Sequence, residues 1–285
     1  MMALLKFLAA VIVMAVLGAT FWYVREVRDR VAVPQLEASE LLDRIAEADG
    51  AEINPGDLAF ERAVELVATG QYEEAEEKLR FIVNFDPGSG AADEARRILG
   101  EMHLDRVLST EDMEGKSIHT VVSGDSFLRI AKQHDTTLDC MMHLNGLHGL
   151  DRLHPGDELV VMPLNFDLKV DVTRKRLGLW NEGKIVKTYR IQDLRLPRGV
   201  KGVARTQVKN KLGFYQGRTC STTHENYRAS SKVLTLGVRG LQIRGVPAAD
   251  EEAPGNGFFV TEEDMEELVL LIRAGNDVEI RFTKR

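Results

Sequence analysis

Cysteine is scarce in this chain, because its 285 residues include only Cys140 and Cys220. The two fall in different predicted domains, so they neither require nor exclude an oxidising compartment. No cysteine follows the apolar run near the N-terminus, which excludes a lipoprotein signal at that position. With 44% hydrophobic residues, the chain is long enough for two or three modest domains.

Acidic side chains are scarce in one block of the chain. Residues 166–244 carry 18 Lys and Arg but only 5 Asp and Glu, a net charge of +13 in a protein whose total is −7. The flanking segments are acidic. Three interpretations of this block are open. It is a solvated surface, it offsets the negative charge of the acidic helical region, or it attracts carboxylates or phosphates.

The N-terminus contains an apolar run over residues 7–24, with Lys6 before it and Trp22-Tyr23 at its end. Such a helix is about 27 Å long, close to the roughly 30 Å of a membrane core. A cleaved signal peptide is the alternative, but Leu17-Gly18-Ala19 is a poor cleavage site. We expect an uncleaved membrane anchor.

Two helical segments follow the anchor. A tether contains one short amphipathic helix over residues 37–48. Beyond it, Gly70, Tyr72, Ala75 and Pro87 have the separations of a helical hairpin that resembles one tetratricopeptide repeat, and a third helix is expected over 91–102. One repeat cannot bury both its faces, so this region is either a spacer or a surface for a protein partner.

Residues 119–163 predict a small βααβ unit from their turn signals and apolar spacing. A strand over 119–122 leads to a turn at 123–126, where Asp125 or Ser126 caps a helix over 127–133. A second helix over 138–144 is expected to end at a left-handed Asn145-Gly146 pair. A proline turn then starts a strand over 158–162.

This unit resembles a LysM domain, the carbohydrate-binding module of cell-wall proteins, over its whole length. The shared features are the His-Thr-Val start, the Gly-Asp-Ser turn, the Asn-Gly pair and the Leu-x-Pro-Gly-Asp loop. The resemblance implies a shallow groove for glycans that contain N-acetylglucosamine, gripped by backbone amides and a few apolar side chains. It assigns to that groove Gly124, Asp125, Ser126, Phe127, Leu150, Asp151, Leu153, His154 and Pro155.

A purely structural role is the alternative for several of these residues. Gly124 and Pro155 would then be turn formers, and Phe127 would belong to the core. For Asn145, which lies outside the groove, we expect only this role, because its place after a helix explains it.

Residues 165–285 predict a mainly β domain closed by one helix. Alternating apolar residues begin a strand at Phe166, a hairpin turns at 181–183, and a last strand includes Val278 and Ile280. A helix capped by Thr261 precedes that last strand and is expected to stop at Gly275.

This domain resembles the L,D-transpeptidase catalytic domain of the YkuD type, most clearly at its first hairpin and its closing helix. The resemblance implies acyl transfer through a cysteine thiolate with histidine as the base. Arg244 stands where the family has the histidine of an Ile-His-Gly segment, and Asn256 and Phe258 stand at the histidine and cysteine of its Ser-His-Gly-Cys motif. Without thiolate and imidazole the family's reaction cannot run there, so no catalytic residue is assigned.

Two other groups of residues could be read as a nucleophile with its base and as a metal site. Cys220 lies four residues before His224 and is an alternative nucleophile, although a loop or core cysteine is the commoner case. Cys140, His143, His148 and His154 are not at tight ligand spacings. We therefore predict neither a metal nor a cofactor.

Together these features predict a multidomain α+β protein of the bacterial inner membrane, single-pass, with most of its chain in the periplasm. Its expected partners are peptidoglycan glycan strands and the membrane, with a protein at the hairpin as the alternative to a spacer role; nucleic acid is not expected. An inactive transpeptidase-like domain would bind or scaffold, and an active L,D-transpeptidase with a relocated nucleophile is the alternative. The predicted boundaries are 1–25 for the anchor, 26–57 for the tether, 58–112 for the helical region, 117–163 for the LysM domain and 165–285 for the transpeptidase-like domain.

Overall fold

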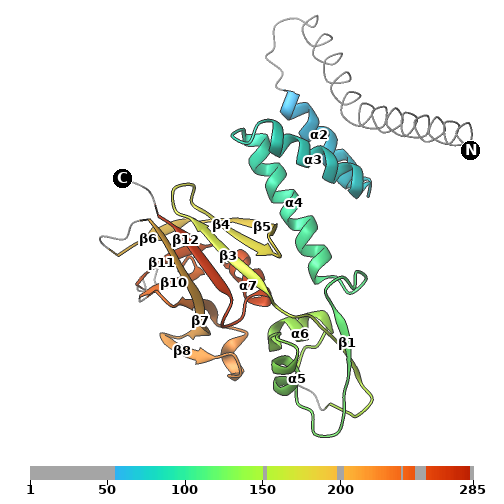
Figure 1. Ribbon diagram of the computed structural model, residues 1–285, viewed down its shortest axis with the longest axis vertical. Coiled ribbons are helices and arrows are strands. Elements are labelled where there is room, and N and C mark those ends of the chain that lie inside the picture. Colours follow the sequence, from blue (N-terminus) through green and yellow to red (C-terminus); the bar gives the residue numbers. More distant parts are fainter. Residues whose placement is uncertain (1–54, 150–152, 198–201, 239, 248–254, 283–285) are drawn as a thin grey trace, which may run out of the picture. The chain divides into compact units, whose positions relative to one another are not determined.

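The computed structural model describes residues 55–149, 153–197, 202–238, 240–247 and 255–282 (Figure 1). The predicted anchor and the predicted tether helix over 37–48 lie outside these ranges. Among the described residues, no helix has the length and apolar character needed to cross a membrane. The chain divides into two compact units, Met1–Lys78 and Leu79–Arg285.

The segment of the predicted hairpin contains two helices, α2 (Pro55–Ala68) and α3 (Tyr72–Phe85). Gly70 ends α2 with a φ of 76°, a conformation that favours glycine. Its N–H donates to the Val67 carbonyl at 3.1 Å, and the Gln71 N–H donates to the Leu66 carbonyl at 2.9 Å. This pair of bonds satisfies the last carbonyls of the helix. The resemblance of the hairpin to a tetratricopeptide repeat stays a prediction.

The third helix, α4 (Gly90–Leu108), continues beyond its predicted end at residue 102. Ser89 caps it by accepting a hydrogen bond from the Ala92 N–H. The helix packs on β5 (Lys184–Arg190), the edge strand of the main sheet. A Cβ placed on Gly100 would lie only 2.8 Å from Lys187 Cγ, so the absence of a side chain permits this contact. The helix thereby covers a sheet edge that would otherwise invite pairing with another chain.

The βααβ unit consists of β1 (Ser117–Thr120), α5 (Phe127–Gln133), α6 (Leu138–Leu144) and β2 (Glu158–Val161). Both helices have their predicted bounds, whereas β1 begins and ends two residues earlier than predicted. The strands pair antiparallel, with His119 opposite Leu159. The unit has its own apolar core, formed by Val121, Ile130, Ala131, Leu138, Met141, Met142, Leu159 and Val161.

Ten strands of the described chain form the main sheet, in the order β5-β4-β3-β12-β7-β9-β10-β11-β6 with β8 paired to β7. The β3·β12 and β10·β11 pairs are parallel and the others are antiparallel. The bounds not given above are β3 (Phe166–Asp171), β4 (Arg176–Asn181), β6 (Asp193–Arg195), β7 (Val203–Tyr215), β8 (Arg218–Ser221), β9 (Ser231–Leu236), β10 (Leu241–Gly245), β11 (Asn256–Val260) and β12 (Asp277–Arg281).

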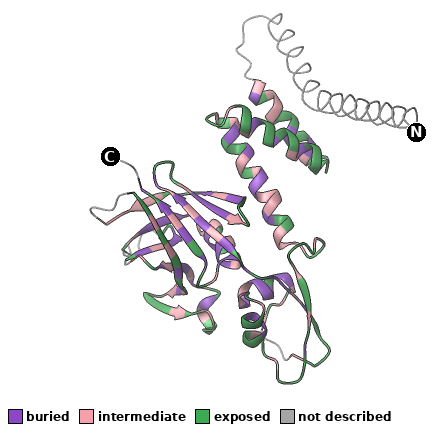
Figure 2. Cartoon of the chain, in the orientation of Figure 1, coloured by how far each residue is buried: buried purple, intermediate pink, exposed green. Residues whose placement is uncertain are grey.

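The helix α7 (Glu262–Leu271) contacts β9 and β10 and completes the core of this mixed α+β domain. Thr261 caps it by accepting from the Asp264 N–H at 3.1 Å, as predicted. Its own side chains Met265, Leu268 and Leu271 are fully buried. Along β3, buried residues alternate with residues of intermediate exposure, the period of two that the sequence predicted from Phe166 onward. Figure 2 shows that the strands of the sheet carry many buried residues.

The βααβ unit contacts the sheet domain through α6 and the segment after β2. Asp139 on α6 forms a 2.5 Å ion pair with Lys211 of β7, whose side chain is buried. The carbonyl of Leu164 accepts hydrogen bonds from Asn276 Nδ2 at 2.7 Å and Arg273 Nε at 3.2 Å. Cys140 packs in the large core of the sheet domain rather than in the small core of its own unit.

Candidate functional site

The turn at residues 123–126 forms the first half of the predicted groove. Gly124 has a φ of 91°, so glycine is suited to this position. Ser126 caps α5 by accepting from the Arg129 N–H at 3.3 Å, which settles the choice between the two predicted caps. Among the described residues, none accepts a hydrogen bond from the backbone N–H of Gly124 or Ser126, and both residues are exposed. Both residues therefore lie in an exposed turn.

Asp125 stabilises this turn through the hydrogen bonds of its carboxylate. Its Oδ2 accepts from the Val122 N–H at 3.0 Å and lies 3.0 Å from His119 Nε2. The hydrogen bond from the Val122 N–H has the larger effect and that from His119 the next; both lower the pKa of the Asp125 carboxyl below its ordinary value. With its side chain only 6% exposed, Asp125 is a structural residue of this turn.

His119 extends this contact into a chain of three side chains. Its Nε2 donates to Asp125, because a carboxylate only accepts, and this leaves Nδ1 of the neutral ring as an acceptor. His134 Nε2 lies 3.0 Å from that Nδ1 and completes the chain as a donor. This chain of side chains connects β1, the turn and the end of α5. No pattern in the sequence indicated that these two histidines would meet.

The second half of the predicted groove is the loop before β2. His154 and Pro155 are exposed, and Leu153 packs partly against the small core. Asp157 shapes the loop by accepting from the His154 N–H at 2.8 Å. The two other predicted groove residues, Leu150 and Asp151, lie outside the described residues.

The backbone of Val121 joins the two halves. Its N–H donates to the Asp157 carbonyl at 2.8 Å, and its carbonyl accepts from the Gly156 N–H at 2.8 Å. The turn at 123–126 and the loop at 153–157 are thus adjacent, as the predicted groove requires. Phe127 packs against the small core, as the structural alternative expected, and offers only part of its ring to a ligand.

Asn145 does more than end a helix, which corrects the expectation for it. Its Nδ2 donates to the Met141 carbonyl at 2.7 Å and the Val160 carbonyl at 2.8 Å, and its Oδ1 accepts from the Val160 N–H at 2.8 Å. Its φ is −103°, so only Gly146, at 60°, is left-handed. The side chain thus bridges α6 to β2, the strand that follows the loop of the predicted groove.

The second predicted site, in the sheet domain, is not assembled on one face. On the parallel pair β10 and β11, Ile243 is in register with Phe258 and Arg244 with Phe259. Because side chains alternate along a strand, Arg244 and Phe258 project to opposite faces. Asn256 shares the face of Phe258. The three substituted positions therefore do not line a common pocket.

The side chains of Arg244 and Phe258 are both buried. Phe258 is fully buried in the core, and Arg244 is 1% exposed with its guanidinium 5.4 Å from the Phe214 ring. On the face of Arg244, β11 presents Gly257, where a Cβ would lie 2.4 Å from the Gln242 carbonyl oxygen. No side chain, and hence no nucleophile, fits at residue 257 without displacing the backbone of the next strand.

The alternative nucleophile, Cys220, and its candidate base, His224, make separate contacts. His224 caps the short helix η1 (Glu225–Tyr227), and its Nδ1 accepts from the Asn226 N–H at 3.2 Å. Cys220 lies against Gly213 on β7, and in the described part of the chain no hydrogen bond links it to His224. Burial raises the pKa of the other cysteine, Cys140, to about 11, so it is a thiol at neutral pH.

Cys140 and the three histidines that follow it in the sequence differ in burial. His143, His148 and His154 are exposed, whereas Cys140 is buried. Within the ranges that the structure describes, no group of three or more Asp, Glu, His or Cys side chains is arranged to hold a metal ion.

Three lysines of the basic block are buried in ion pairs. Lys187 contacts Glu101 at 2.7 Å and Glu267 at 2.5 Å. Lys211 contacts Asp139, and Lys232 contacts Glu266 at 3.0 Å. This part of the positive charge therefore joins elements of the protein, and one partner, Glu101, belongs to the acidic helix α4.

Comparison with known proteins identifies the family of the βααβ unit. Residues 119–161 match the family model of the LysM domain. No curated relative matches the chain.

Similar solved structures include a cysteine-to-serine mutant of Enterococcus faecium L,D-transpeptidase (15% identity, TM-score 0.30). This chain is covered over 48% of its length in that match and spans 59% of the other chain. An L,D-transpeptidase from Stackebrandtia nassauensis has 12% identity and a TM-score of 0.32, with 52% and 66% covered. The catalytic domain of the Enterococcus faecium enzyme acylated by ertapenem has 14% identity and a TM-score of 0.28, with 41% and 96% covered. The chain thus contains a LysM domain at residues 119–161.

Proposed function

We propose that this protein binds peptidoglycan glycan strands, at N-acetylglucosamine units, through the groove between residues 123–127 and 153–155. The observation that carries the proposal is the double hydrogen bond at Val121, which sets the exposed turn beside the exposed loop within a LysM domain. The backbone amides of Gly124 and Ser126 suit acetamido carbonyl groups, which accept hydrogen bonds. The ligand's hydroxyls would remain largely hydrated.

The sheet domain serves as a binding or scaffolding partner of this module and does not transfer acyl groups. In support, Phe258 and Arg244 are buried on opposite faces, and Gly257 has no room for a thiol-bearing side chain. Acyl transfer of this type needs a nucleophile within hydrogen-bonding reach of its base. The ion pair between Asp139 and Lys211 instead fixes the LysM domain to this scaffold.

The protein acts at the outer face of the bacterial inner membrane, held by a single-pass anchor at residues 1–25. The length and apolar character of the run over 7–24 support the anchor. The ligand of the LysM domain, which lies outside the cytoplasm, supports an orientation with most of the chain in the periplasm. A protein partner at α2 and α3 remains part of this proposal.

Glycan binding is tested by sedimentation with purified peptidoglycan. The full chain is expected to co-sediment, and His154→Ala is expected to weaken binding several-fold, because the 74% exposed ring lies on the loop of the groove. His143→Ala, at an exposed position of α6, is the matched control and should bind as the unchanged protein does. Equal binding by all three proteins would contradict the assignment of the groove.

Catalytic inactivity is tested separately. The full chain is incubated with tetrapeptide muropeptides and the products are read by mass spectrometry. We expect neither release of the terminal D-alanine nor a covalent adduct on Cys220. Turnover that disappears in Cys220→Ala would establish the alternative, an L,D-transpeptidase with a relocated nucleophile.

A further inference from the structure

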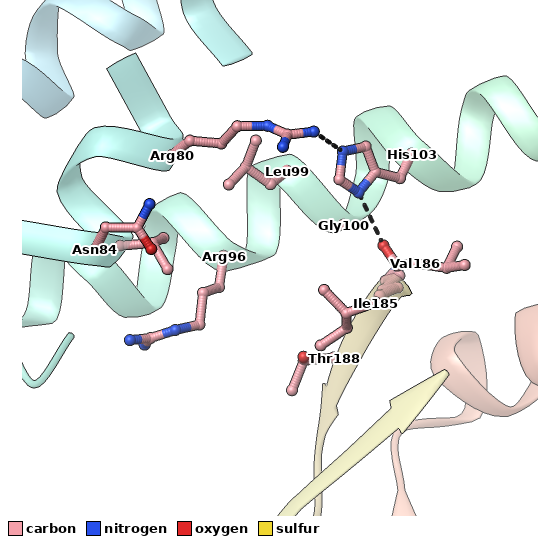
Figure 3. Close-up of a pocket in the computed structure, with 11 residues that line it drawn as sticks. Arg80, Asn84, Arg96, Leu99, Gly100, His103, Ile185, Val186 and Thr188 are labelled. Atoms are coloured by element: carbon pink, nitrogen blue, oxygen red, sulfur yellow. Dashed lines mark hydrogen bonds between the residues drawn. The ribbon is translucent and has the colours of Figure 1, made fainter. Parts of the chain in front are cut away.

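A cavity of about 280 Å³, lined by the end of α3, by α4 and by β5, has charged side chains that are already engaged within the protein (Figure 3). All its lining residues belong to the unit Leu79–Arg285. Arg96 pairs with Asp93 at 2.5 Å, and the guanidinium of Arg80 points to His103. Lys187 is paired with two glutamates. The protein thus uses the positive charge of this cavity for its own contacts.

Arg129, by contrast, carries its charge at the surface beside the predicted glycan groove. It lies in the first turn of α5, directly after the turn at residues 123–126, and it is exposed. Its Nη1 donates to the Gly124 carbonyl at 2.8 Å. The same nitrogen lies 3.7 Å from the position that a Cβ would take on Gly124. The guanidinium is therefore held against the exposed turn of the groove.

The positive charge of Arg129 is not used in an ion pair. In the described part of the chain, its side chain pairs with no Asp or Glu. Asp125 attracts it, but that carboxylate is 6% exposed and is already bonded to the Val122 N–H and to His119. A guanidinium has five N–H donors in a planar fork, and the contact with Gly124 uses one of them. The remaining donors match the geometry of a carboxylate.

The other half of the groove carries charge of the opposite sign. The side chain of Asp157, on the loop before β2, is 47% exposed, and its Oδ2 accepts from the His154 N–H at 2.8 Å. A negative group on a ligand is repelled on this side and attracted on the side of Arg129. The groove therefore gives an anionic glycan strand a preferred placement, with its negative group at the turn.

Peptidoglycan strands differ from strands made only of N-acetylglucosamine by the charge of every second sugar. That sugar, N-acetylmuramic acid, bears a lactyl ether whose carboxylate is either free or joined to a stem peptide that has carboxylates of its own. A guanidinium beside the groove attracts either kind of carboxylate, and it gains no such contact from an uncharged strand. Arg129 is therefore placed to distinguish the two kinds of strand.

We propose that Arg129 is a specificity-determining residue of the groove, which contacts a carboxylate on the sugar substituent, either the lactyl group itself or the stem peptide attached to it. The N-acetylglucosamine unit lies in the groove, and the neighbouring substituted sugar lies on the side of Arg129. This inference rests on the proposed function, because it needs a glycan in the groove. It adds that the groove prefers anionic peptidoglycan strands to uncharged strands.

The test is calorimetric titration of the full chain, at low ionic strength, with four strands of four sugars each. One is the N-acetylglucosamine tetramer. The other three alternate N-acetylglucosamine with N-acetylmuramic acid, and their lactyl groups are free acids, uncharged methylamides or carriers of stem tetrapeptides. We expect a carboxylate-bearing strand to bind about threefold more tightly than the methylamide, because an exposed ion contact contributes modestly. About 0.5 M salt should remove this preference.

The two anionic strands identify the source of the carboxylate. A preference for the free acid alone over the methylamide assigns the contact to the lactyl group. A preference for the tetrapeptide strand alone assigns it to the stem peptide. Either result supports the proposal.

Variants locate the preference at one side chain. Arg129→Gln should remove it, so that acid and methylamide bind equally, and Arg129→Lys should restore part of it because the charge is kept. Lys132→Gln is the matched control, since Lys132 is another exposed cation of α5, and it should keep the preference. Thermal unfolding checks that each variant is folded.

The outcomes separate this inference from the function on which it rests. Binding of the N-acetylglucosamine tetramer, with no preference for either anionic strand over the methylamide, would overturn the inference alone. A preference that survives in Arg129→Gln, or that is lost equally in Lys132→Gln, would overturn it too. No binding of any of the four strands would overturn both.

Discussion

At the scale of single residues, the LysM domain depends on buried polar side chains that position an exposed backbone. Asp125 organises the turn through the Val122 N–H and His119, and Asn145 fastens α6 to β2. The sequence predicted both positions as turn or cap residues from local spacing. Their partners could not be predicted, because they come from strand pairing and helix packing, which local sequence patterns do not encode.

The role of Asp125 predicts a pH dependence. Its folded-state pKa is lowered, so it stabilises the fold above its unfolded pKa, near the ordinary value of 3.8, and this contribution is lost as pH falls through the folded pKa. Asp125→Asn should therefore lower the thermal midpoint at pH 7, and the gap to the unchanged protein should narrow below about pH 4. Glu158→Gln, at an exposed carboxylate of β2, is the control. A gap that stays constant down to pH 2 would contradict this role.

The bridge formed by Asn145 predicts a loss of stability. Asn145→Ala removes three hydrogen bonds and leaves the Val160 N–H and carbonyl without this partner. The expected cost is about 1–3 kcal/mol, measured by urea unfolding. Faster hydrogen exchange at the Val160 amide would locate the effect. Unchanged exchange there would show that the side chain is dispensable.

At the scale of elements, the sequence predicted helices better than the contacts between them. Both LysM helices have their predicted bounds, because capping serines and threonines and glycine stops are local signals. The register of β10 and β11 is not local, and it places Arg244 and Phe258 on opposite faces. The contact of α4 with β5 likewise joins segments that are more than eighty residues apart.

The contact at Gly100 predicts opposite effects for two glycines of the same helix. Gly100→Ala should destabilise the protein by about 1–3 kcal/mol, because the new Cβ meets Lys187 Cγ. Gly90→Ala meets nothing within 4 Å and should be neutral or stabilising by up to about 1 kcal/mol. Urea unfolding of both variants checks this. Equal effects would mean that α4 does not rest on β5.

At the scale of the whole molecule, the unit Leu79–Arg285 joins the LysM domain to the sheet domain through a buried ion pair. The ion pair of Asp139 with Lys211 lies at this junction, and Lys211 also donates to the Val269 carbonyl. The sequence showed a block of positive charge, but it did not show that three lysines of this block are buried in ion pairs. Removing one partner of a buried pair is costly because the other charge is left uncompensated.

The junction therefore predicts a large effect of Asp139→Ala. We expect a loss of about 3–5 kcal/mol or separate unfolding of the two parts, measured by calorimetry. Asp139→Ala combined with Lys211→Met should recover part of this loss, because no buried charge remains. An additive loss in the double variant would contradict the coupling.

The central claim is that residues 123–127 and 153–155 bind N-acetylglucosamine units. The most direct test is the change in amide chemical shifts of the full chain on titration with an N-acetylglucosamine tetramer. The account predicts that the largest changes are at Gly124, Ser126 and His154, with little change at α7. Changes that cluster elsewhere, or none at millimolar ligand, would contradict it.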